Sequence, residues 1–181
     1  MSLDYLHGLG WQFVGGEQVP WPSALARGPH AWAQIATFVI SGLLVGVLAV
    51  SLSEGLPDRR TSKLAVVLMG LLGAGLILAA CPVDAPMLTG GQPETWNGWI
   101  HGIAFLMIIA TGLLAPLAMA LAVRRDASWR PMTVVSLAAA ALFVLFLFLP
   151  WGNATFLMAI ATVFAWIAAV AAGLRTSYAK P

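Results

Sequence analysis

Five long apolar stretches, separated by short polar segments, dominate the pattern of hydrophobic and polar positions along this chain. Each is close to or above the ~20 residues that a helix needs to cross a hydrocarbon core of ~30 Å. No Asp, Glu, Lys or Arg lies in the interior of any stretch, and such a charge at mid-bilayer costs at least ~2.5 kcal/mol. The pattern therefore predicts an all-α membrane protein, a bundle of five transmembrane helices. The predicted spans are 31–52, 63–80, 99–123, 132–149 and 154–174.

The composition of the chain excludes a soluble fold. Its 181 residues are 60% hydrophobic and only 9% charged, whereas an average soluble domain is about 25% charged. Residues 1–30 contain no apolar run long enough to span, and their aromatic residues predict a surface segment anchored at the membrane interface. The single cysteine, Cys81, excludes an internal disulfide, so cysteine usage does not indicate the redox compartment.

The basic residues lie almost entirely on one side of the predicted bundle. Of the nine Lys and Arg residues, only Arg27 falls on the other side. Because cytoplasmic loops carry the excess of Lys and Arg, this bias places the N-terminus outside and the tail, 175–181, in the cytoplasm. The loop 81–98 between the second and third spans then faces outward. The basic residues on the predicted cytoplasmic side are Arg59, Arg60, Lys63, Arg124, Arg125, Arg130, Arg175 and Lys180.

Two ionisable residues, Asp84 in this loop and His101 just after it, are the leading candidates for a catalytic or ligand-binding role. Pro82 and Pro86 bracket Asp84 and stiffen the chain, so its carboxylate could bind a cation, accept a proton or pair with His101. Alternatively, Asp84 caps a turn. His101 lies at the edge of lipid, where an ionisable side chain is a functional candidate by default. It could bind a ligand or carry a proton, or it could hydrogen-bond a backbone carbonyl. Both interpretations stay open for both residues.

Further candidates for ligand binding lie on the same outer side. Ser23 and His30 precede the first span, and Trp96 and Trp99 stand at the start of the third. Anchoring at the membrane interface explains the tryptophans, and a lipid or aromatic ligand stacked among them is the alternative. The predicted ligand-binding set is Asp84, His101, Trp96, Trp99, Ser23 and His30.

No motif has the spacing of a known metal or catalytic site. A zinc site needs three or four protein ligands. The candidate ligands show no tight spacing such as HxxxH, so no metal is predicted. Ser23, His101 and Asp84 can be written as a triad, but no nucleophile elbow accompanies them. There is no glycine-rich phosphate loop and no basic patch for nucleic acid, so a nucleic-acid partner is not expected. The candidate metal ligands are Asp84, Glu94, His101 and His30.

Two stretches, PSALARGPHAWAQIATFVISGLL and CPVDAPMLTGGQPETWNGWIHGIAF, resemble a bacterial membrane family known as domain of unknown function 998. The resemblance covers roughly residues 20–175 and implies a multi-pass protein of the bacterial cytoplasmic (inner) membrane. Members usually begin with one more spanning helix, which residues 1–20 cannot supply, so this chain has lost that helix or its start lies upstream. The family implies no activity. Its characteristic serine, proline, aspartate and histidine match Ser23, Pro82, Asp84 and His101.

Three functions are compatible with these features. The first is a non-catalytic membrane protein, either an accessory subunit of a larger membrane complex or a binder of lipid or a small amphipathic ligand at the outer face. Its partners would be membrane lipid and other membrane subunits. The second is an enzyme at the outer leaflet that uses Asp84 and His101 as an acid–base pair. The third is a small transporter, which the scarcity of polar groups inside the spans disfavours. The sequence identifies no cofactor.

Overall fold

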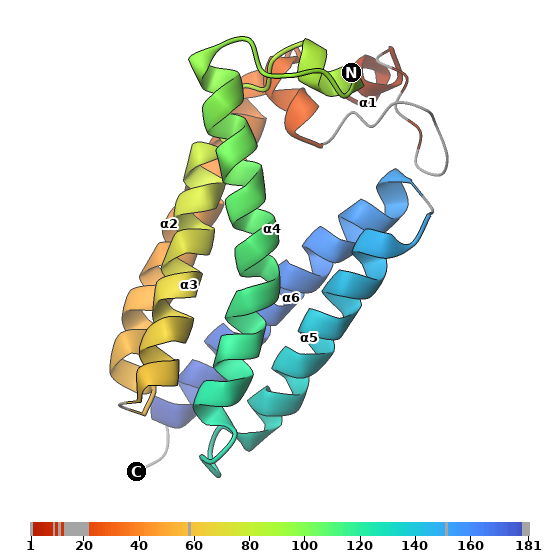
Figure 1. Ribbon diagram of the computed structural model, residues 1–181. Helices are drawn as coiled ribbons and strands as arrows, with labels where there is room; N and C mark the ends of the chain where they lie inside the picture. Colours follow the sequence, from red (N-terminus) through yellow and green to blue (C-terminus); the bar gives the residue numbers. More distant parts are fainter. Residues whose placement is uncertain are drawn as a thin grey trace.

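The computed structural model of the chain describes residues 2–8, 10, 12, 22–57, 59–150 and 152–178 (Figure 1). Three aromatic residues of the segment 1–30, which is expected at the interface, lie outside the described residues: Trp11, Phe13 and Trp21. The long helices are α2 (Ala31–Gly55), α3 (Arg60–Leu78), α4 (Trp96–Val123), α5 (Arg130–Phe148) and α6 (Asn153–Tyr178). The short helical segments are α1 (Ser2–Gly8), η1 (Pro22–Arg27) and η2 (Pro86–Thr89).

The predicted fold class is confirmed, since the described chain is all helical and its five long helices are long and apolar enough to cross a membrane. The helix ends differ from the predicted spans by a few residues. α4 begins at Trp96, ahead of the predicted start at 99, because the Thr95 side chain caps its first turn. α6 continues to Tyr178, past the predicted end at 174, so Arg175 belongs to the helix.

The long helices pack in a layer of α2, α3 and α4, with α5 against α4 and α6 against both α5 and α2 (Figure 1). η1, η2 and the loop 79–95 cover one end of the bundle, which we call the capped end. The turns that carry the basic residues lie at the opposite end, together with the C-terminal end of α6. The capped end thus holds every candidate site residue.

The layer of α2 and α3 depends on two glycines that face each other. A Cβ added at Gly42 would lie 2.5 Å from the Gly73 carbonyl oxygen, and one added at Gly73 would lie 2.8 Å from that of Gly42. Only glycine permits this approach of the two backbones, and close packing replaces the missing hydrophobic drive between helices in lipid. Gly46, the partner of Gly42 in a GxxxG pair, has open space where its Cβ would be.

The other half of the bundle is held by larger side chains. Trp166 of α6 is 2% exposed, and its indole N–H donates to the Ser136 hydroxyl of α5 over 3.0 Å. Phe143 of α5 is buried against Gly112 of α4, whose missing side chain makes room for the ring. A buried indole with a satisfied N–H adds packing area without an unpaired donor.

We expect Gly42→Ala to lower the free energy of unfolding by about 1–3 kcal/mol, the usual cost of overpacking a close contact. The added methyl group would meet backbone atoms of α3, which cannot rotate away. Thermal unfolding of the purified protein in detergent measures the effect. Gly46→Ala, one turn away on the same helix, is the control and should not lower the unfolding temperature, because its Cβ would meet open space and Ala favours a helix more than Gly does. Equal losses in the two variants would contradict the assignment.

Candidate functional site

The Asp84 carboxylate joins the loop 79–95 to the start of α4. Its Oδ2 accepts from the backbone N–H groups of Glu94 and Thr95 at 2.8 and 2.7 Å, and its Oδ1 accepts from the Thr95 hydroxyl at 2.7 Å. The Thr95 hydroxyl oxygen in turn accepts from the Gly98 N–H at 3.3 Å and so caps α4. A side chain at position 98 would overlap the Asp84 carboxylate. Asp84 is therefore the anchor of this loop.

These contacts hold the pKa of Asp84 below its ordinary value of 3.8. The hydrogen bond from the Thr95 hydroxyl is the main cause, followed by the Thr95 backbone N–H, with smaller contributions from Glu94 and from the positive charge of Arg27. Arg27 also donates from Nη1 to the Val83 carbonyl over 2.9 Å, which ties η1 to the loop. A carboxylate whose pKa is lowered is a weak base. It is poorly suited to general base catalysis, because proton transfer is most effective when the pKa lies near the working pH.

His101 makes a separate contact. Its Nδ1 lies 2.8 Å from the Cys81 carbonyl oxygen, and the residue is 6% exposed. Among the described residues, no hydrogen bond joins His101 to Asp84, and the Asp84 carboxylate takes its three hydrogen bonds from Glu94 and Thr95. An acid–base pair of Asp84 and His101 would require Asp84 to give up the contacts that anchor the loop.

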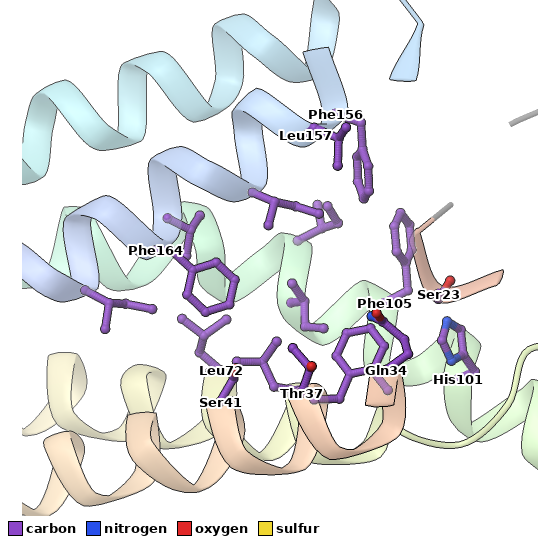
Figure 2. Close-up of a pocket in the computed structure, with 18 of the residues that line it drawn as sticks. Ser23, Gln34, Thr37, Ser41, Leu72, His101, Phe105, Phe156, Leu157 and Phe164 are labelled. Atoms are coloured by element: carbon purple, nitrogen blue, oxygen red, sulfur yellow. The ribbon is translucent and has the colours of Figure 1, made fainter. Parts of the chain in front are cut away.

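His101 lies at one end of a cavity of about 250 Å³ between α2, α3, α4 and α6 (Figure 2). Its wall is apolar apart from His101, Ser23 of η1 and three residues of α2. Ser23 and His101 lie together at one end of the cavity, and the polar residues of α2 follow from there toward Leu72. The polar residues of α2 are Gln34, Thr37 and Ser41, and the apolar residues include Leu72, Leu76, Phe105, Ile108, Phe143, Phe156, Ile160, Phe164 and Ile167.

Helical periodicity brings these side chains to one cavity. On α4 the lining residues are 101, 105, 108 and 109, and on α6 they are 156, 157, 160, 163, 164 and 167. Positions three or four apart share one face of a helix, so each helix contributes a single stripe. From 156 to 167 the α6 stripe covers about 16 Å at ~1.5 Å per residue, roughly half of the ~30 Å hydrocarbon core.

The other predicted ligand-binding residues do not reach this cavity. Trp96 and Trp99 are 83% and 53% exposed and point away from the bundle core, as interfacial anchors do. His30 lines a neighbouring hollow of about 120 Å³ that shares Gln34 and Thr37 with the main cavity. Of the six predicted residues, the structure brings only Ser23 and His101 to the cavity wall. Within the described ranges, no three His, Cys, Asp or Glu residues lie close enough to hold a metal ion.

Two parts of the site were not predicted from the sequence. Thr95 has a readable signal, because a threonine directly before a helical run is typical of an N-cap. The phenylalanines of the cavity, Phe105, Phe156 and Phe164, have none. Every face of a transmembrane helix is apolar, so hydropathy does not separate a cavity wall from a lipid-facing surface.

The fold and the cavity define a multi-pass integral membrane protein with an apolar internal site. The chain belongs to the family described as "Protein of unknown function (DUF998)", whose sequence model matches residues 22–175. This confirms the family expected from the Ser23, Asp84 and His101 stretches. No curated protein and no solved structure matches the chain.

The Asp84 anchor predicts a particular pH dependence. Because the folded pKa is below 3.8, the ionised carboxylate stabilises the fold above that pH, and this contribution is lost as the pH falls below it. Asp84→Asn should therefore lower the unfolding temperature at neutral pH, and the difference from the wild type should shrink below pH 3.8. Thermal unfolding in detergent across this range measures it.

Glu94→Gln is the control for this prediction. It removes a carboxylate from the same loop, but the backbone N–H that Asp84 accepts from is retained and the side chain is exposed. This variant should unfold like the wild type over the whole pH range. A constant difference between Asp84→Asn and the wild type over the whole range would show that the charge of Asp84 is not what stabilises the loop.

Proposed function

We propose that this protein is a non-catalytic binder of an apolar or amphipathic small molecule, such as a membrane lipid, in the cavity between α2, α3, α4 and α6. The observation that carries the proposal is the cavity itself, with about 250 Å³ of space, an apolar wall and a polar end at Ser23 and His101. Protein interiors are close-packed and contain few voids larger than a water molecule. A partly open hollow of this size between spanning helices is a feature that binding would explain.

The size and lining of the cavity support a ligand rather than trapped water. An engineered apolar cavity of ~150 Å³ stays dry and binds benzene or xenon, and this cavity is larger. Pockets that bury whole drug-sized ligands are typically ~300–1,000 Å³, so this cavity suits a small molecule or the end of a longer chain. The few polar groups at one end would fix the orientation of such a molecule.

The membrane supplies both the ligand and its route. The cavity is partly open, and its walls are helices long and apolar enough to span the bilayer, which favours entry from among the lipid tails. Large apolar side chains are exposed along α2, among them Leu43, Leu44, Val47 and Val50, as expected of a surface in contact with lipid. With the basic turns in the cytoplasm, the capped end faces outward in a bacterial cytoplasmic membrane.

Photolabelling tests the proposed binding. The purified protein in lipid nanodiscs is illuminated with a long-chain alkyl diazirine that has no polar group, and the modified peptides are identified by mass spectrometry. We expect adducts on cavity residues such as Phe105, Phe156 and Phe164, and we expect Ile160→Trp, which fills the cavity, to lower their yield at least fivefold, or about 1 kcal/mol of binding free energy.

Met158→Trp is the matched control on the same helix. Met158 is 44% exposed and does not line the cavity, so labelling should match the wild type. Adducts spread evenly over lipid-facing residues such as Leu44 and Val47, with no response to Ile160→Trp, would refute the proposal.

A further inference from the structure

The contact between His101 and Cys81 determines which ring nitrogen carries a proton. The Cys81 carbonyl oxygen can only accept, so the Nδ1 atom 2.8 Å away must donate. In the neutral ring, the other nitrogen, Nε2, is then unprotonated and acts as an acceptor. The backbone contact thus fixes both the orientation of the ring and its tautomer.

Within the described chain, no hydrogen bond is made to Nε2, although the residue is 6% exposed. His101 belongs to the wall of the cavity, and Figure 2 shows it at the same end as Ser23. His101 Nε2 is not among the fully enclosed polar atoms of the described residues that lack a hydrogen bond, so a donor in the adjoining space can reach it. The cavity is the space from which a donor could reach it.

The surroundings of His101 indicate that this donor is uncharged. No Asp, Glu, Lys or Arg is among the described residues that line the cavity. Two charged residues of the capped end are engaged elsewhere, with Asp84 bound to Thr95 and Arg27 bound to the Val83 carbonyl. A charged head group placed here would be desolvated without a counter-ion, which is costly. The Ser23 hydroxyl and the Gln34 amide offer neutral hydrogen-bonding groups instead.

We propose that the ligand of this cavity is an amphipathic alcohol, whose hydroxyl group donates to Nε2 of His101 and whose apolar chain lies along α6. The same hydroxyl oxygen can accept from Ser23 or Gln34, since an alcohol is both donor and acceptor. Long-chain alcohols, isoprenoid alcohols and glycerides with a free hydroxyl belong to this class. The inference rests on the proposed function and specifies the head group that the cavity selects.

Competition against the alkyl diazirine in lipid nanodiscs tests this selectivity. The competitors are a long-chain alcohol, its methyl ether, and the carboxylate and primary amine of the same chain length. The methyl ether has the same chain and oxygen but no proton to donate. We expect the alcohol to compete at least about fivefold better than the ether, the effect of one buried hydrogen bond, and better than either charged analogue.

His101→Asn tests the residue. An asparagine amide can occupy the position of Nδ1 and still donate to the Cys81 carbonyl, but it has no acceptor at the position of Nε2. The ratio between alcohol and ether should fall to about one in this variant. His30→Asn is the matched control, because His30 lies in the neighbouring hollow and not on the cavity wall, and it should keep the wild-type ratio.

The outcomes separate the two proposals. Equal competition by alcohol and ether in the wild type, with cavity labelling intact, overturns the head-group inference and leaves the proposed binding function standing. Preference for the carboxylate also overturns it, since it would require a protonated ring. If the diazirine does not label the cavity at all, both proposals fail. The comparison of alcohol and ether in the wild type decides the question even if His101→Asn does not fold.

Discussion

The three hydrogen bonds that the Asp84 carboxylate accepts from Glu94 and Thr95 hold the capped end of the bundle together. They fold the loop 79–95 back onto the first turn of α4 and leave room only for glycine at position 98. Because the loop is fixed in this way, the Cys81 carbonyl lies against the His101 ring. The orientation of His101, and with it the polar end of the cavity, therefore depends on the Asp84 carboxylate.

The cavity follows from how the two halves of the bundle meet. α2, α3 and α4 form a tight layer, in which Gly42 and Gly73 bring two backbones together. α5 and α6 lean away from that layer toward the capped end (Figure 1). The cavity lies on this side, and α6 lines it from Phe156, near the capped end, down to Ile167. The bundle thus combines a tightly packed layer of α2, α3 and α4 with a hollow where α5 and α6 lean away from that layer.

The chemistry of the site differs from the one that the residue types alone favoured. A carboxylate and a histidine close in sequence are typical of an acid–base pair, yet each has its own backbone partner, and the pKa of Asp84 is lowered rather than raised. Asp84 is a structural anchor. His101 is compatible with both interpretations that its sequence position allowed, since Nδ1 lies 2.8 Å from a backbone carbonyl oxygen and the residue also lines the cavity. This arrangement supports the proposed binding function rather than proton transfer between the two residues.

The sequence by itself determined the all-α fold, the five spans and the separation of the basic turns from the loop 81–98. These features depend on local hydropathy and charge, because each segment inserts into the bilayer according to its own hydropathy and the charges that flank it. It also singled out Ser23, Asp84 and His101, because polar groups are rare and costly in such a chain. Even the helix ends were close, and the early start of α4 follows from the Thr95 cap.

Only the tertiary structure decided which side chains meet. The pairing of Gly42 with Gly73, the hydrogen bonds of Asp84 with Thr95 and the cavity between α4 and α6 all join residues that are not neighbours in the sequence. In a span that is apolar on every face, no periodicity marks the side that faces a neighbour or a cavity. The exclusion of Trp96 and Trp99 from the site has the same cause, because hydropathy gives the depth of a residue in the membrane but not the direction in which its side chain points.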